Sequence, residues 1–136
     1  WLRAAVSFDN APDPASGIGA YIDAKMEISL SHPNGSKVWA SEVMHGAPVI
    51  QDYLEGTLRE WTEGRMAAIQ DWIDAGQMAP IDPRHLLYML WATTQHYADF
   101  GHQVETLNDG QPLSERDWQL AKDNIKTIIL RGIGAA

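Results

Sequence analysis

The chain has 136 residues, 45% of them hydrophobic, which suits a single domain that buries its own core. It contains no cysteine, which excludes disulfide frameworks and thiolate metal sites and is compatible with a cytoplasmic protein. Its longest apolar runs are too short to cross a bilayer. The formal net charge of −8 argues against nucleic-acid binding by these residues alone, because phosphate binding needs clustered Lys and Arg.

The first half of the chain predicts short helices separated by Pro and Gly. An amphipathic stub at 1–6 is followed by a Pro- and Asp-rich breaker at 9–17. A helix over 18–31 places an apolar stripe on one face, consisting of Ile18, Ile22, Met26 and Leu30. The motif HPNG at 32–35 predicts a turn, and the next helix ends at Gly46, where a left-handed cap is favoured.

The second half predicts longer helices. One runs over 47–76, ends at a glycine and has a broad apolar face, made by Ile50, Leu54, Leu58, Trp61, Ala68 and Trp72. Asp82 is a good N-cap and Pro83 suits the first helical position, so a further helix should run from about residue 82 past Phe100. Ser114 and Asp117 approximate a capping box that opens a last helix over 114–132. Its inward residues should be Trp118, Ala121, Ile125, Ile128 and Ile129.

These elements predict an all-α helical bundle of about five helices, forming one domain over residues 1–136. No strand-like alternation is sustained anywhere in the chain, and no internal repeat is found. Residue 1 is a tryptophan rather than a methionine, so we expect the chain to continue upstream.

Catalytic patterns are weak in this sequence. It has no cysteine nucleophile, no G-x-S-x-G motif and no phosphate-binding loop. Helical bundles can hold metal through Glu-x-x-His pairs, and Glu42 with His45 has that spacing. However, His45 lies at a helix end, where it can instead interact with exposed carbonyls. Asp99 with His102 is a similar half-match, so neither a metal nor another cofactor is expected.

The stretch WATTQHYADF at 91–100 combines polar and aromatic residues in one helix. On a helical wheel one face is apolar and suits a core or an interface, with Leu86, Leu90, Thr93, Tyr97 and Phe100. A second face carries Trp91 and Gln95, with Tyr88 and His102 nearby. An aromatic platform with a few directional polar groups is typical of a small-molecule pocket.

Two interpretations of Trp91 and Gln95 remain open at this point. They can be a packing residue beside a solvated amide, or they can both contact a ligand. A glutamine amide offers an acceptor next to two donors, so it can bind a planar ring that has an N–H beside a C=O. A tryptophan can stack on the same ring.

The segment GQMAPIDPRHLLYMLWATTQHYADF at 76–100 closely resembles TetR-family regulators of pyrimidine utilisation. The likeness also includes GAP at 46–48 and the final IILRGI, and it extends from about Trp1 to Gly132. It is weakest at 9–17 and 106–117, and the 36–45 helix departs in several side chains.

The resemblance implies a C-terminal ligand-binding and dimerisation domain, not an enzyme, whose N-terminal helix-turn-helix DNA-binding domain is absent from this sequence. It implies uracil or thymine as the effector and carries ligand contact to Trp91 and Gln95. It carries the same role to Trp1, as the last turn of the helix that connects the two domains. It also implies a homodimer through helices 82–104 and 114–132, and operator DNA as a partner through the missing domain only.

In the dimer we expect the apolar faces of both helices to meet the second copy, through Leu86, Leu90, Tyr97, Trp118, Ile125 and Ile129. Two alternatives to the pyrimidine sensor stay open. The first is a domain of the same family that binds another planar or apolar ligand. The second is a small helical metal-dependent enzyme.

Overall fold

The computed structural model describes residues 2–135, and within that range every regular element is a helix, as the periodicity predicted. The elements in chain order are the 3-10 turn η1 (Leu2–Ala5), α1 (Val6–Asp9), α2 (Pro14–Ser31), α3 (Pro33–Met44), α4 (Gln51–Tyr53), the π-helical segment η2 (Leu54–Leu58), α5 (Arg59–Asp74), α6 (Pro83–Asp99), α7 (Gly101–Leu107) and α8 (Glu115–Gly132). None of the helices in this range is long and apolar enough to span a membrane.

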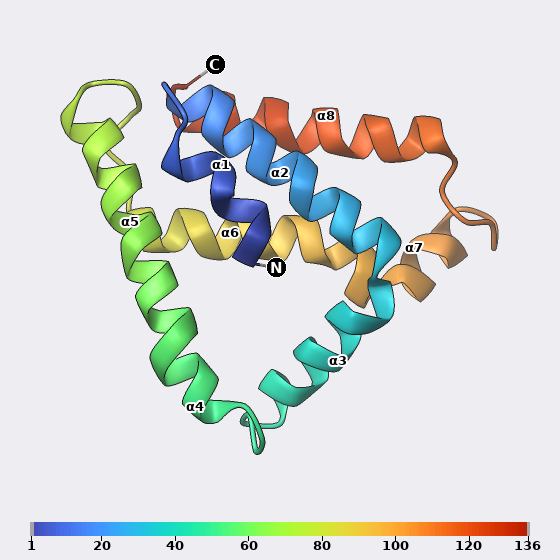
Figure 1. Ribbon diagram of the computed structural model, residues 1–136. Helices are drawn as coiled ribbons and strands as arrows, with labels where there is room; N and C mark the ends of the chain where they lie inside the picture. The colour runs from blue at the N-terminus through green and yellow to red at the C-terminus, as the bar shows by residue number, and fades with distance from the viewer. Residues whose placement is uncertain (1, 136) are drawn as a thin grey trace.

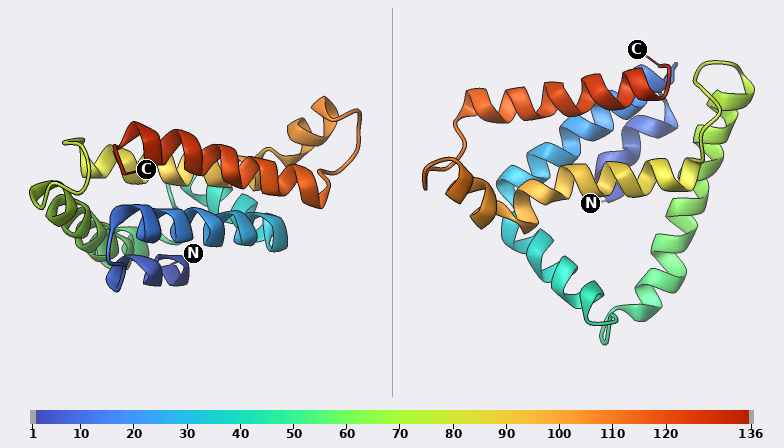
Figure 2. Two further views of the ribbon diagram at one scale, coloured as in Figure 1. Left: turned by 90° about the horizontal axis from the view of Figure 1, so that it is seen from above. Right: turned by 180° about the vertical axis from the view of Figure 1, so that it is seen from behind.

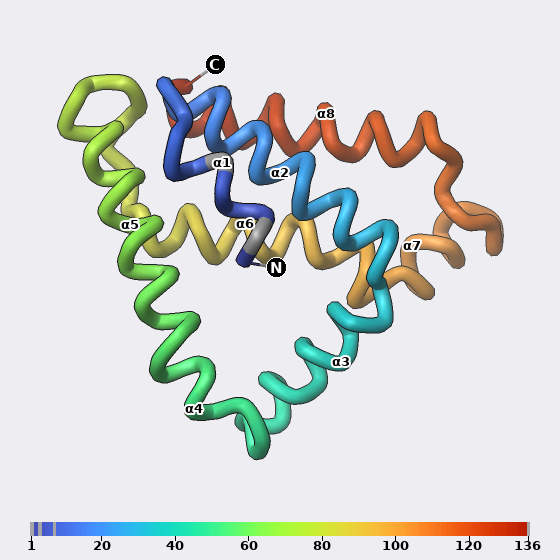
Figure 3. Tube along the Cα trace, viewed as in Figure 1, coloured from blue at the N-terminus to red at the C-terminus, as the bar shows by residue number. Residues whose placement is uncertain are grey.

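Helix α2 is the centre of the packing, because it contacts α1, α3, α6 and α8. Figure 1 shows α3 and the continuous α4–η2–α5 rod meeting at one tip, with α6 closing the third side of a triangle. Seen from above, α1 and α2 lie on one side of α6 and α8 (Figure 2). The tube in Figure 3 shows α1 turning back into α2, which lies alongside α8.

The core gathers the buried apolar faces of α2, α5, α6 and α8. Its most deeply buried side chains are Ile18, Ile22, Met26, Ile69, Leu87 and Leu90, each 0% exposed. The expected stripe on α2 is confirmed for its first three residues. Leu30 departs from it and is 47% exposed, because the last turn of α2 packs against α6 through Ser29, whose hydroxyl donates to the Thr94 carbonyl oxygen.

The predicted helix ends are largely confirmed. The Asp82 side chain accepts a hydrogen bond from the His85 backbone N–H at 3.1 Å, and Pro83 is the first helical residue. Ser114 and Asp117 form both hydrogen bonds of the capping box. Gly46 and Gly76 have φ of +84° and +75°, the left-handed geometry expected after a helix.

Several predicted boundaries were wrong. The helix that begins after Asp82 ends at Asp99 rather than running past residue 100, because Phe100 leaves helical geometry (φ −116°, ψ 31°) and Gly101 starts a separate helix. Asn34 and Gly35 belong to α3 rather than to a turn, since Pro33 serves as its first residue. Similarly, α2 begins inside the predicted breaker, at Pro14, with Asp13 as its N-cap.

The expected dimer face also needs correction. Leu90 and Ile125 are at most 8% exposed because they pack into the core of their own chain. Leu86 and Ile129 are also largely buried there, but both line the apolar groove between α6 and α8. Ile128, which we expected to point inward, is 63% exposed. The exposed apolar side chains of α6 and α8 include Met89, Leu120 and Ile128. Tyr97 and Trp118 are half-buried and contact each other, with their ring centroids 5.6 Å apart.

Candidate functional site

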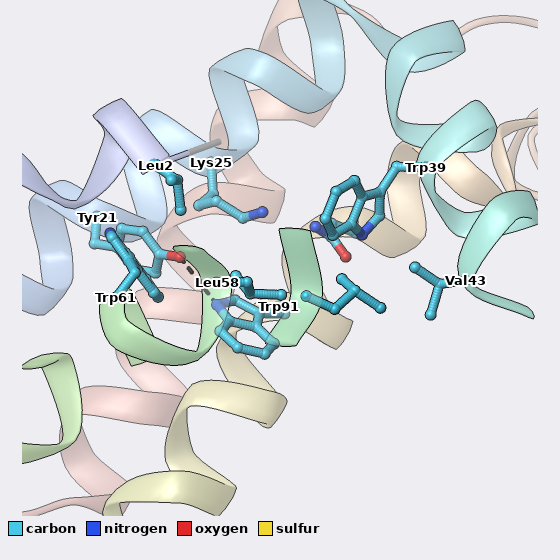
Figure 4. Close-up of a pocket in the computed structure, with 10 residues that line it drawn as sticks. Leu2, Tyr21, Lys25, Trp39, Val43, Leu58, Trp61 and Trp91 are labelled. Atoms are coloured by element: carbon cyan, nitrogen blue, oxygen red, sulfur yellow. Dashed lines mark hydrogen bonds between the residues drawn. The ribbon is translucent and has the colours of Figure 1, made fainter. Parts of the chain in front are cut away.

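A cavity of about 290 Å³ lies inside the triangle of helices (Figure 4). It is bordered by α2, α3, the η2–α5 part of the long rod and α6, with Leu2 of η1 contributing from the N-terminal side. Its lining is largely aliphatic and aromatic: Leu2, Tyr21, Lys25, Trp39, Val43, Leu54, Leu58, Trp61, Trp91 and Gln95. Its size and composition are those of a pocket for a small organic molecule.

Helical spacing explains how each element supplies its part of the lining. Residues four apart lie on the same helix face, so α2 presents Tyr21 and Lys25 together and α6 presents Trp91 and Gln95 together. The π-helical segment contributes Leu54 and Leu58 in the same way. Each of these helices therefore contributes two residues, four positions apart, to the wall of the cavity, although the helices are far apart in the sequence.

Aromatic rings form a connected group on one side of the cavity. The Trp61 ring lies 6.2 Å from that of Trp91 and 6.3 Å from that of Tyr21, measured between centroids. The Trp91 Nε1–H donates to the Tyr21 hydroxyl oxygen at 3.1 Å, which fixes the indole to α2. The Arg65 guanidinium lies 5.6 Å from the Trp61 ring centroid, on the face of the ring. These contacts hold flat apolar surfaces at defined angles around the space.

Two side chains give the cavity its directional polarity. The Gln95 amide is half-buried and makes no hydrogen bond to any residue within 2–135. Lys25 is 1% exposed, and its burial lowers the pKa of the ammonium to about 7, while the Asp99 carboxylate opposes that shift. Asp99 itself accepts a hydrogen bond from the Ser36 hydroxyl at 2.5 Å. Burial also raises the pKa of the Tyr21 phenol, which keeps it neutral.

The structure places Trp91 and Gln95 at the same cavity, as their spacing predicted. Trp91 also packs in the protein through its ring contacts and its bond to Tyr21, so the packing interpretation and the ligand interpretation both apply to it. The ligand role of both residues stays a prediction. Trp1, the third expected contact, lies outside the described residues. His102, expected nearby on the wheel, lines a different surface hollow beside α7.

Sequence reasoning missed most of the lining. Lys25, Tyr21, Trp39 and Trp61 come from other helices, and no local pattern connects them with Trp91. One clue was available, because Lys25 falls within the apolar stripe of α2, between Ile22 and Met26. A lysine placed among core positions is unusual enough to mark a site.

Both members of the half-match formed by Glu42 and His45 have other partners. Both the Val49 and Ile50 backbone N–H groups donate to the Glu42 carboxylate, at 2.7 and 3.0 Å. The His45 Nδ1 lies 2.6 Å from the Ser41 carbonyl oxygen, the helix-end contact expected for it. Among residues 2–135, no three His, Asp or Glu side chains are grouped as metal ligands would be.

Comparison with known proteins gives a consistent family match. Residues 1–136 match the family described as the C-terminal region of YcdC-like proteins, one of the TetR C-terminal types. The chain is 38% identical over 133 residues to the HTH-type transcriptional regulator RutR of Escherichia coli O157:H7, and equally to RutR of strain K12 and of Shigella flexneri. The alignments cover 98% of this chain and 63% of each relative. These relatives are named as regulators and not as enzymes.

Proposed function

Because this chain belongs to the TetR-type family of YcdC-like C-terminal regions, we propose that its cavity binds a pyrimidine base, uracil or thymine, and thereby regulates transcription. The relatives are longer than this chain and are named helix-turn-helix regulators. In the proposal, a DNA-reading part outside these residues contacts operator DNA, and the domain described here senses the effector in the cytoplasm.

One observation carries the choice of ligand. The Gln95 amide faces an aromatic cavity and has no protein hydrogen bond among the described residues. The amide is open to the cavity and has both an acceptor and donors to offer, so a ligand that presents a donor and an acceptor side by side can form both bonds. The N–H and C=O edge of uracil or thymine has that pattern, and its flat ring suits the indoles of Trp91 and Trp61.

A short series of contacts connects the cavity to the N-terminal side of the domain. The Tyr21 phenol, which holds Trp91, contacts Phe8 of α1 with ring centroids 5.1 Å apart. Helix α1 is in turn tied to α5 by an ion pair between Asp9 and Arg65. An effector changes DNA binding only if it prefers one arrangement of these elements over another. We propose that this link converts occupancy of the cavity into a shift of the segment before α2.

The regulator is further proposed to act as a homodimer through α6 and α8. An apolar groove of about 360 Å³ runs between these two helices, and its lining includes Met89, Ile128 and Ile133. Two helices from each copy would form a four-helix interface. Operators with two half-sites require two reading heads held at a fixed spacing.

The test is isothermal calorimetry of the protein with uracil, thymine and cytosine, on the wild type and on Gln95→Leu. Leucine is close to glutamine in volume and favours helix, so the fold should persist. Each ligand group left unpaired costs about 1–3 kcal/mol, so Gln95→Leu should weaken uracil binding roughly tenfold to a hundredfold per group. Gln103→Leu is the matched control, because it makes the same change on exposed α7 and should leave affinity unaltered.

Each other outcome has a defined meaning. Unchanged uracil affinity in a folded Gln95→Leu variant would make Gln95 a solvated amide beside a packing tryptophan. Binding of another planar or apolar compound in place of the bases would identify a sensor of the same family with a different effector. Chemical turnover of a base would point to an enzyme.

A further inference from the structure

Tyr21 brings a hydroxyl group to the wall of the cavity from a buried position on α2. Its side chain is 2% exposed, yet it is one of the residues that line the cavity. The ring packs edge-on against Phe8, with centroids 5.1 Å apart, and lies 6.3 Å from the ring of Trp61. Figure 4 shows the hydroxyl oxygen pointing away from α2 toward Trp91. Protein contacts therefore hold this hydroxyl group in one place at the cavity.

The hydrogen-bonding capacity of this hydroxyl is only half used. A phenol has one O–H donor and an oxygen that accepts, whereas an indole N–H is a donor only. In the bond of 3.1 Å between the two side chains, Trp91 therefore donates and Tyr21 accepts. Burial raises the pKa of the phenol, so Tyr21 keeps its own hydrogen. Among the residues that the structure describes, none accepts that hydrogen.

The side chains around the cavity offer few acceptors for this hydrogen. Trp39 and Trp61 have an N–H donor and no acceptor, and no Asp or Glu side chain is part of the lining in the described chain. The bond from Trp91 also polarises the hydroxyl, which makes its O–H a better donor. An oxygen atom of a bound ligand would therefore find a buried donor that is already held in place.

The position of Tyr21 relative to Gln95 suits a ligand that contacts both residues. Trp91, the hydrogen-bond partner of Tyr21, lies four positions before Gln95 on α6, a rise of about 6 Å along the helix axis. A six-membered ring with a carbonyl oxygen on each side of an N–H can bridge such a span. The Gln95 amide can pair with the N–H and one carbonyl, which leaves the second carbonyl oxygen for Tyr21.

We propose that the Tyr21 hydroxyl, held by Trp91, donates a hydrogen bond to a carbonyl oxygen of the effector that Gln95 does not contact. The proposal rests on the pyrimidine-sensing function above and adds a second polar contact to the same site. The ligand then bridges α6 and α2 through Gln95 and Tyr21. Because the Tyr21 ring also packs against Phe8 of α1, the ligand binds a residue that touches the N-terminal segment directly.

The first test measures uracil binding by calorimetry in Tyr21→Phe and Tyr53→Phe. Phenylalanine keeps the ring, so the contacts with Phe8 and Trp61 persist and only the hydroxyl is lost. Tyr21→Phe leaves a ligand oxygen without its donor and should weaken uracil binding about tenfold. Tyr53→Phe makes the same change on α4, outside the cavity lining, and should leave the affinity unaltered.

The second test separates a direct contact from a displacement of Trp91, because the indole also loses its acceptor in Tyr21→Phe. The two monothiouracils each replace one carbonyl oxygen of uracil by sulfur, which is a weak acceptor. In the wild type, the analogue with sulfur at the position bound by Tyr21 should bind about tenfold more weakly than uracil. In Tyr21→Phe that difference should disappear, while the difference for the other analogue remains. A displaced Trp91 would instead weaken the binding of uracil and of both analogues equally.

The outcomes separate the two proposals. If the wild type binds none of these ligands, the pyrimidine-sensing function fails, and the role of Tyr21 fails with it. If uracil binds and Gln95→Leu weakens it, but Tyr21→Phe keeps the affinity or weakens all three ligands equally, only the role of Tyr21 is overturned. If Tyr21→Phe does not fold, Gln95→Leu decides. One monothiouracil must still bind that variant more weakly than uracil, and equal binding of all three ligands would overturn the role of Tyr21.

Discussion

The hydrogen bond between Trp91 and Tyr21 joins α6 to α2 at the edge of the cavity. The Tyr21 side chain is 2% exposed, and its hydroxyl oxygen accepts the indole N–H at 3.1 Å. Tyr21→Phe removes the acceptor and leaves a half-buried N–H without it. We expect the free energy of unfolding to fall by about 1 kcal/mol. Urea denaturation followed by the fluorescence of the six tryptophans measures the change.

Tyr53→Phe provides the comparison for that variant. Tyr53 is 37% exposed and contacts Trp39 through its ring, with centroids 5.8 Å apart. Loss of its hydroxyl should therefore alter stability by only a few tenths of a kcal/mol. Equal effects of the two substitutions would mean that the bond to Trp91 adds nothing to stability.

Helix α5 and its C-terminal turn contain two glycines whose substitution by alanine should have opposite effects on stability. Gly64 lies inside the helix, and an added Cβ would meet no heavy atom within 4 Å. Gly64→Ala should therefore stabilise the protein by about 0.5–1 kcal/mol. Gly76 has a φ of +75°, so Gly76→Ala should destabilise it by about 1 kcal/mol. Chemical denaturation of the two variants checks the opposite signs, and a shared sign would contradict this account of the helix end.

At the scale of the whole molecule, the proposed dimer depends on the exposed residues of α6 and α8. Ile128 is 63% exposed and lines the apolar groove between these helices. In a dimer through this groove, Ile128→Lys would bury an unpaired charge and should shift the protein to monomer at micromolar concentration. Sedimentation velocity measures the shift, and circular dichroism should show an unchanged fold, because the residue lies outside the core of its own chain.

Val38→Lys is the control for the dimer. Val38 is 71% exposed on α3, outside the groove between α6 and α8, and its substitution should leave the sedimentation unchanged. A wild-type protein that sediments as a monomer at these concentrations would rule out the proposed assembly.

Local chemistry allowed the sequence to determine the helices, most of their caps and one side of the site. Helical periodicity, the Asp82 N-cap and the Ser114 capping box act within a few residues of the chain, so they can be read without a neighbour. The i,i+4 spacing likewise places Trp91 and Gln95 on one face of α6.

The tertiary structure alone decided what lies opposite those residues and which faces are covered. Lys25 reaches the cavity from α2, 70 positions before Gln95, and no periodicity relates two such distant helices. Ile125 and Ile128 are both apolar residues of α8, yet one is buried and the other exposed, because Ile125 packs into the hydrophobic core whereas Ile128 lines the open groove between α6 and α8. A helical wheel gives the angle between side chains, whereas burial depends on where the neighbouring helices pack.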